Sequence, residues 1–145
     1  MTLLLRLATA ADVPPMHAIR LAVRENRLSD ANTIGEHSYL PYVEQGAAWV
    51  ATTQGRIAGF AALDLRQATV WALFVDPDCE GLGVGRALHE RLIAAAASKG
   101  LTRLQLTTSP GTRAEHFYRR SGWMPVEIAE AGEIRFELNL PGTRG

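Results

Sequence analysis

The sequence predicts one domain of the α/β (α+β) class, built on a mixed, mostly antiparallel sheet of about seven strands with four helices. Residues 47–75 contain three strand-like stretches separated by short turns, which predicts an antiparallel meander. The apolar strand at 69–75 then leads through a glycine turn into a helix from Val84. The length of 145 residues fits one domain with one core, so we expect a single domain over 1–145.

The first elements are a strand at 3–8 and a helix that follows a capping box. Thr9 to Asp12 has the capping-box pattern, in which Asp12 reaches back to the N-cap residue. Two prolines fit only the first helical turn, and the helix is expected to run to about Asn26. Its apolar face is expected to consist of Ile19, Ala22 and Val23.

A second helix is predicted over 36–45, after a loop that ends at Gly35. Pro41 would have to kink or split this helix, because proline lacks an N–H and clashes with the preceding turn. Strands at 47–53 and 56–65 then form a hairpin. The later elements are a helix at 84–99 with Gly100 as its C′ residue, a strand at 101–108, a helix at 112–120, and strands at 123–129 and 133–140.

Composition excludes several classes of partner. Fifteen basic and fifteen acidic residues give no net charge, and no basic run is present, so we expect no nucleic acid. Neither a leader-like N-terminus nor a run of about twenty apolar residues is present, which predicts a soluble cytoplasmic protein without a membrane contact. The single cysteine, Cys79, excludes an internal disulfide framework and fits a reducing compartment.

The segment Gly81-Leu82-Gly83-Val84-Gly85-Arg86 joins the strand at 69–75 to the following helix. Glycines at alternate positions permit a tight turn and leave the backbone N–H groups accessible. These groups lie at a helix N-terminus, where unpaired donors and the helix dipole both favour an anion. The segment therefore predicts a phosphate or pyrophosphate site, with a purely structural glycine turn as the alternative.

Two nucleotide-binding patterns do not fit this segment. A dinucleotide-binding fold needs a glycine where Leu88 stands and an acidic residue where Gln105 stands. A P-loop needs lysine and serine or threonine where Arg86 and Ala87 stand. The order of strands and helices also excludes a standard Rossmann domain.

With these motifs the chain resembles the GNAT N-acetyltransferase superfamily. The resemblance covers nearly the whole chain and depends on the order and spacing of several modest motifs. These are Ala8–Asp12, Gly59-Phe60-Ala61, Leu73–Pro77, Gly81–Leu88, Ala114–Tyr118 and Gly122-Trp123.

The resemblance implies that acetyl-CoA is the cosubstrate. It implies a sheet splayed between its fourth and fifth strands, with the pantetheine arm bonded to the backbone near Leu73 and Val75. The N–H of Phe74 or Val75 would stabilise the oxyanion, and the segment from Gly81 to Arg86 would bind the pyrophosphate. Tyr118 would be the general acid that protonates the departing thiolate, with core packing as the alternative.

Two positions depart from the family pattern. Glu80 stands where glutamine or arginine is usual, and we expect it to point away from the loop or to pair with a nearby arginine. Gly111 stands where many members carry an asparagine that contacts the cofactor. Both departures bear on cofactor affinity.

The general base and the acceptor are not identified by the sequence. The candidate bases are Glu25, Glu36, His37 and His116, with a water chain as the alternative. The arginines that could hold CoA phosphates are Arg86, Arg113, Arg119 and Arg120. His17 and His89 lack clustered ligand partners, so we expect no metal site.

The resemblance implies an N-acetyltransferase that acts on a primary amine of a small molecule or peptide by direct attack through a tetrahedral intermediate. The alternative is a non-catalytic acyl-CoA-binding module of the same fold that acts as a sensor. A homodimer is common for the fold and stays open here.

Overall fold

The computed structural model describes residues 2–23 and 34–140. The strands are β1 (Leu3–Leu7), β2 (Ala48–Thr53), β3 (Arg56–Asp64), β4 (Thr69–Val75), β5 (Arg103–Thr108), β6 (Met124–Ile128) and β7 (Ile134–Asn139). The α-helices are α1 (Val13–Ala22), α2 (Leu40–Glu44), α3 (Val84–Ser98) and α4 (Arg113–Arg120). Short 3₁₀ helices are η1 (Ala10–Asp12), η3 (Glu36–Tyr39) and η4 (Pro77–Cys79).

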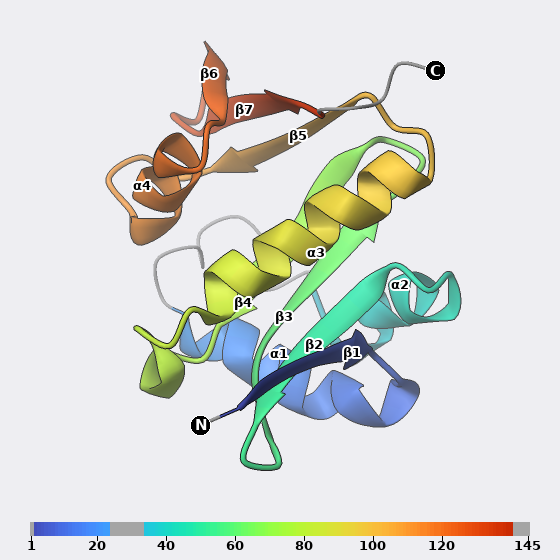
Figure 1. The fold of residues 1–145 in the computed structure, drawn as a ribbon. Coiled ribbons are helices and arrows are strands. Elements are labelled where there is room, and N and C mark those ends of the chain that lie inside the picture. Colours follow the sequence, from blue (N-terminus) through green and yellow to red (C-terminus); the bar gives the residue numbers. More distant parts are fainter. Residues whose placement is uncertain (1, 24–33, 141–145) are drawn as a thin grey trace.

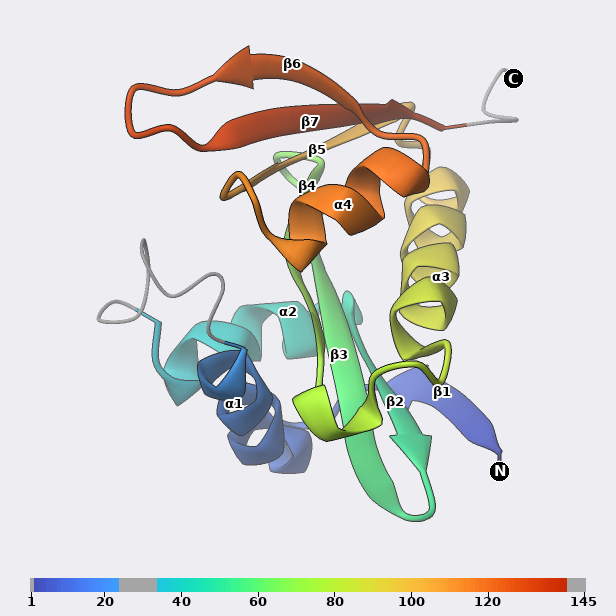
Figure 2. The same cartoon turned by 90° about the vertical axis from the view of Figure 1, so that its left-hand side faces the viewer.

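All seven strands form one sheet in the order β1-β2-β3-β4-β5-β7-β6. Every neighbouring pair is antiparallel except β4 and β5, which are parallel. Helix α3 covers one face of β2 to β4, and α1 and α2 cover the other face (Figures 1 and 2). The predicted mixed, mostly antiparallel sheet with four helices is therefore confirmed.

Two hydrophobic clusters fill the two faces of the sheet. Trp49, Ala51 and Leu63 pack with α3, whereas Val50 and Phe60 pack with α1 and Tyr39 of η3. Because β2 and β3 are buried on both faces, their sequences read as nearly continuous apolar runs. The buried centre of the sheet thus supports β4, the strand on which the site is built.

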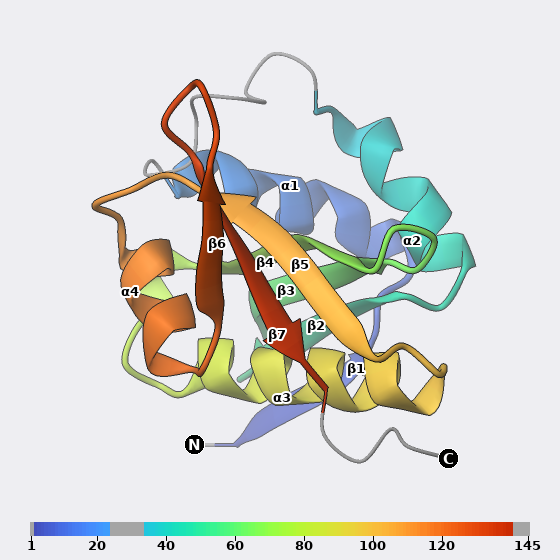
Figure 3. The same cartoon turned by 90° about the horizontal axis from the view of Figure 1, so that it is seen from above.

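Strands β4 and β5 separate soon after they meet. Within the described residues their recorded pairing joins Thr69 to Gln105, and the strands diverge beyond this point (Figures 2 and 3). The register against β3 passes from Ala72 to Val70, so Trp71 is an extra, bulged residue. A bulge bends a strand and increases its twist, which assists the divergence. The splay expected from the resemblance is present.

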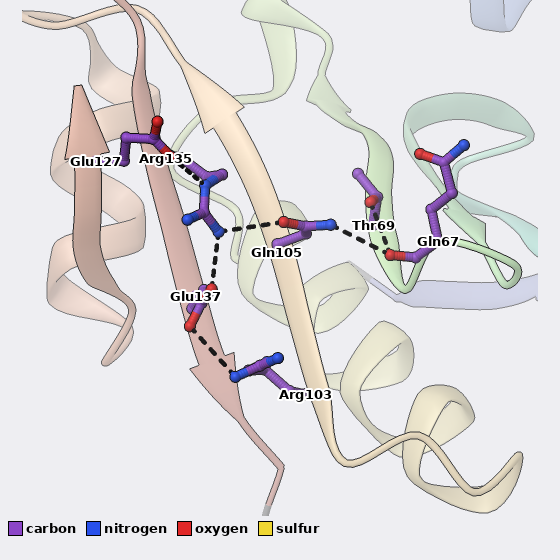
Figure 4. A network of polar contacts seen from close by, with 7 residues as sticks. All are labelled: Gln67, Thr69, Arg103, Gln105, Glu127, Arg135 and Glu137. Atoms are coloured by element: carbon purple, nitrogen blue, oxygen red, sulfur yellow. Dashed lines mark hydrogen bonds and ion pairs between the residues drawn. The ribbon is translucent and has the colours of Figure 1, made fainter. Parts of the chain in front are cut away.

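A network of polar side chains joins the strands where β4 meets β5 (Figure 4). Arg135 on β7 donates hydrogen bonds to Gln105 (3.3 Å), Glu127 (3.0 Å) and Glu137 (2.7 Å). The amide of Gln105 donates to the carbonyl of Gln67, at the turn that precedes β4 (3.3 Å). The network therefore fixes the closed end of the splay.

The N-terminal helix is shorter than its sequence suggests. Val23 has an extended backbone (φ −87°, ψ 99°), so α1 ends at Ala22, and the expected end near Asn26 is wrong. Ile19 is buried as expected, but Ala22 is exposed and Val23 is half-buried, so these two do not belong to the core face. Asn26 itself and most of the loop expected before Gly35 lie outside the described residues.

Two local signals in the same region are confirmed. The N–H of Thr9 donates to the Asp12 carboxylate (2.8 Å), which completes the capping-box contact, and Arg6 pairs with the same carboxylate (2.7 Å). The segment 36–45 is split into η3 and α2, with Pro41 in the first turn of α2.

Over residues 2–23 and 34–140, every helix is too short or too polar to cross a lipid bilayer.

Candidate active site

The loop between β4 and α3 owes its shape to two glycines in the left-handed region. Gly81 has φ +84° and Gly83 has φ +80°, and a side chain at either position would be strained. Gly83 is the N-cap residue of α3, so the first N–H groups of that helix follow it directly. These N–H groups lack acceptors within the helix and make the loop suitable for an anion.

The ladder between β3 and β4 fixes the direction of each backbone group on β4. The N–H of Asp76 donates to the carbonyl of Ala58 (2.8 Å). Hydrogen-bonded and non-hydrogen-bonded residue pairs alternate in an antiparallel ladder. The backbone N–H and C=O groups of Phe74 therefore point toward Phe60 on β3. The N–H and C=O groups of Leu73 and Val75 therefore point away from β3, into the splay beside β5.

A pocket of about 730 Å³ opens beside these groups. Its walls come from the end of β4, the glycine loop, the start of α3, helix α4 and the end of α1. The lining residues include the predicted Leu73, Phe74, Val75, Gly81, Gly83, Val84, Gly85, Arg86 and Tyr118. Within the glycine segment 81–86, Leu82 alone does not line the pocket; its side chain is exposed.

Tyr118 on α4 is buried and lines the pocket. Its ring makes an edge contact with Trp123 at 5.5 Å and with Phe117 at 5.3 Å between centroids. Burial raises the pKa of Tyr118, because the surroundings disfavour the phenolate. The hydroxyl therefore keeps its proton through the physiological pH range, as a proton donor requires.

A model of the acetyltransferase (GNAT) family matches residues 16–123 of this chain. This span is well over half of the chain and includes β4, the glycine loop and α4. The chain belongs to the GNAT family.

Two curated proteins named as acetyltransferases are similar to this chain over most of its length. Serotonin N-acetyltransferase 2, chloroplastic, from Oryza sativa subsp. japonica is 34% identical over 123 residues, which is 81% of this chain and 59% of that protein. L-2,4-diaminobutyric acid acetyltransferase from Nocardia farcinica is 32% identical over 116 residues, which is 75% of this chain and 58% of the relative. This chain thus matches less than two thirds of the length of either relative.

Solved structures share the fold at low identity. A putative acetyltransferase from Salmonella typhimurium, solved with its cofactor acetyl-CoA, has a TM-score of 0.80 at 20% identity and covers 100% of this chain and 98% of that chain. The ribosomal-protein-S18-alanine N-acetyltransferase from Escherichia coli has a TM-score of 0.72 at 22% identity, with 96% and 94% covered. These likenesses agree with the GNAT fold seen in the sheet order.

The two positions that depart from the GNAT pattern each have a partner in the structure. Glu80 forms an ion pair with Arg113 at the edge of the pocket, one of the two arrangements that the sequence left open. Gly111 has φ +77°, and its N–H donates to the Glu115 carboxylate (2.7 Å). This bond lowers the pKa of Glu115, which stays ionised and also accepts a bond from Arg119 (2.8 Å).

The candidate phosphate-binding cations and bases separate into two groups. Arg86, Arg113, Arg120 and His116 line the pocket. Arg119 does not; it pairs with Glu115 and lies over the ring of Phe136. Glu36 and His37 are exposed on η3 and do not line the pocket, and Glu25 lies outside the described residues.

Some lining residues were not foreseen as part of the site. Ala22 and Val23 form one wall, although the sequence assigned them to the core, and Phe117 lines the pocket as well as packing against α3. A helical register through Met16, Ile19 and Arg20 would have shown that Ala22 lies off the buried face.

The remaining histidines have partners of their own. His17 forms a hydrogen bond with the Tyr39 hydroxyl (2.9 Å), and His89 accepts one from the indole N–H of Trp123 (2.9 Å). Among the described residues, histidine, cysteine and acidic side chains form no group of three or more that could hold a metal ion.

Proposed function

We propose that this chain transfers the acetyl group of acetyl-CoA to a primary amine of a small molecule or peptide. The observation that carries the proposal is one pocket in which the splayed backbone of β4, the glycine loop and Tyr118 meet. The names of the rice and Nocardia relatives specify amine acceptors, serotonin and L-2,4-diaminobutyric acid. The acceptor of this chain is proposed at the level of the primary amine.

The glycine loop is proposed to bind the pyrophosphate of acetyl-CoA. Main-chain N–H groups from Gly81 to Arg86 and the dipole of α3 supply the attraction, so it does not require the glutamine or arginine that Glu80 replaces. The Salmonella structure of the same fold contains acetyl-CoA, which supports this assignment. Arg86, Arg113 and Arg120 line the pocket and are proposed contacts for the phosphates, with the charge of Arg113 offset by its ion pair with Glu80.

The backbone of β4 is proposed to align the pantetheine arm and to stabilise the transition state. Leu73 and Val75 present their N–H and C=O groups to the splay, where an extended ligand can pair with them like an added strand. Val75 is the proposed oxyanion donor, because the N–H of Phe74 is directed to β3. A preorganised donor of this kind is worth roughly 10²–10³ in kcat.

In the chemical step, the neutral amine attacks the thioester carbonyl, and a C–N bond forms. The Val75 N–H holds the resulting oxyanion. Collapse of the tetrahedral intermediate breaks the C–S bond, and the Tyr118 hydroxyl donates its proton to the departing sulfur. The pocket-lining His116 is the proposed acceptor of the proton that the amine loses, with a water chain as the alternative, and this proton then passes to solvent. The Tyr118 phenolate is reprotonated from solvent.

A panel of amines tests the proposal, with release of free CoA thiol as the readout. We expect thiol release that depends on at least one amine, together with an acetylated product detected by mass spectrometry. Saturable binding of acetyl-CoA without turnover over aliphatic, aromatic and peptide amines would instead support the acyl-CoA sensor. Failure to bind acetyl-CoA would overturn both readings.

A further inference from the structure

Four aromatic rings form a closed circuit between α3 and α4. His89 contacts Phe117 (5.5 Å between centroids) and Trp123 (6.2 Å), and Tyr118 contacts both Phe117 (5.3 Å) and Trp123 (5.5 Å). Two of these rings belong to different helices. His89 is on α3, the helix whose first turn forms the proposed pyrophosphate site, whereas Tyr118 is on α4.

One directed hydrogen bond closes the circuit. The indole N–H of Trp123 donates to Nε2 of His89 at 2.9 Å. Trp123 is 2% exposed, so its N–H has lost access to solvent and depends on this acceptor. Nε2 accepts a bond only when it carries no proton, so this geometry requires a neutral imidazole with its proton on Nδ1.

Trp123 also supports Tyr118 directly. Its backbone N–H donates to the carbonyl of Tyr118 (3.0 Å), and its ring packs edge-on against the Tyr118 ring. Movement of Trp123 therefore moves the C-terminal end of α4 and the tyrosine with it. We propose that neutral His89 is a positioning residue, which fixes Tyr118 against the start of α3 through its hydrogen bond with Trp123.

The expected effect of His89 on kcat rests on the proposed function of Tyr118. The expected effect of His89 on the position of Trp123 and Tyr118 does not. Protonation of His89 removes the acceptor for the Trp123 N–H and places a cation among aromatic rings. The pKa of His89 is lowered mainly by burial, against a smaller opposite effect of Glu90 on the same helix. On α4, Tyr118 stays neutral, and Arg120 lies over the Phe117 ring at 5.9 Å. The neutral form of His89 thus prevails at pH 7.

The sign of the pH effect follows from this shift. A histidine with a lowered pKa in the folded state binds fewer protons than it does in the unfolded chain. Its contribution to stability is complete above the unfolded value of about 6.5 and is lost as the pH falls through the lower folded pKa. We therefore expect misplacement of Tyr118, and a fall in kcat, on the acid side of pH 6.5.

Two variants of His89 separate positioning from mere packing. His89→Gln carries an amide oxygen that can accept the indole N–H and does not titrate. His89→Leu fills a similar volume without an acceptor. We expect His89→Leu to lower kcat roughly 10-fold, since a small displacement of an acid removes part of its 10²–10⁴-fold contribution. We expect KM for acetyl-CoA to stay within about twofold, because the anion site is unchanged.

The test measures kcat and KM from pH 5 to 8.5 and follows the indole ¹H–¹⁵N signal of Trp123 by NMR over the same range. In the unmodified chain, the Trp123 signal should change with one pKa, and kcat should fall with the same pKa in addition to any fall caused by protonation of His116 or of the amine. His89→Gln should retain kcat at pH 7.5 and should lose the pH change of the Trp123 signal together with the part of the fall in kcat that accompanies it. His89→Leu with unchanged kcat, or a Trp123 signal that does not respond to pH, would overturn the positioning role. If no acetyl transfer occurs with any amine, the proposed function fails, while the NMR titration still decides whether the protonation state of His89 controls its hydrogen bond with Trp123.

Discussion

Gly83→Ala tests the glycine loop, the feature on which the proposed cofactor site depends. Gly83 has φ +80° and is the N-cap residue of α3, and a Cβ added there would meet no atom within 4 Å. The substitution therefore adds no clash. It adds only the cost of placing an L-residue with a side chain in the left-handed region.

That cost is about 1–2 kcal/mol. If the loop keeps its shape, the free energy of unfolding falls by about this amount, less a few tenths for the stiffer unfolded chain, and Tm falls by about 2–6 °C. If the loop relaxes instead, acetyl-CoA has to restore the strained shape on binding. The same free energy then appears as an increase in Kd of roughly 5–30-fold.

Gly46→Ala is the matched control. Gly46 has φ +69°, is equally free of neighbours, and lies between α2 and β2, away from the pocket lining. Calorimetric titration with acetyl-CoA and thermal unfolding should give a stability loss alone for Gly46→Ala. For Gly83→Ala the stability loss and the rise in Kd, expressed as free energies, should together reach about 1–2 kcal/mol. An equal rise in Kd for both variants, or no change in either quantity for Gly83→Ala, would refute the reasoning.

Three further substitutions have directional outcomes. Tyr118→Phe should lower kcat roughly 10²–10⁴-fold and leave the Kd for acetyl-CoA within about twofold of its original value. Steady-state kinetics and a binding titration measure the two quantities, and an unchanged kcat would contradict the role of Tyr118 as the acid. Glu80→Gln removes a carboxylate beside the proposed phosphate site and should lower the KM for acetyl-CoA, by at most about fivefold; a higher KM would count against the site. Asp12→Asn should cost about 1.5–3 kcal/mol at pH 7, measured by denaturant unfolding. The pKa of Asp12 is lowered mainly by its bond to Arg6, so its contribution is present above about pH 4 and lost as the pH falls through the folded pKa. A penalty as large at pH 2 as at pH 7 would contradict this account.

Most elements of the fold were predictable because their signals are local. The capping box at Thr9, the split at Pro41 and the helix end at Gly100 each depend on residues within one or two turns. The predictions of the family and of the splay depended on the order of several motifs along the chain. The end of α1 was misplaced, because the residues after Ala22 have the composition of a helix and nothing local marks the extended Val23.

Features of the site that join distant segments were not predictable from the sequence. The bulge at Trp71 depends on the register of β3 against β4, and the hydrogen bond from Trp123 to His89 joins residues 34 positions apart. The choice between Phe74 and Val75 as oxyanion donor required knowing which residues of β4 bond to β3. The hydrogen bond from Asp76 to Ala58 supplies this. Glu80 was left with two arrangements, because Arg113 comes close only when α4 is folded against the loop.

A crystal structure with CoA tests the central claim most directly. We predict that the pantetheine arm pairs with the backbone of Leu73 and Val75 between β4 and β5. We also predict the pyrophosphate on the N–H groups between Gly81 and Arg86, and the sulfur beside the Tyr118 hydroxyl. CoA bound elsewhere on the chain, or with its sulfur remote from both Val75 and Tyr118, would contradict the account.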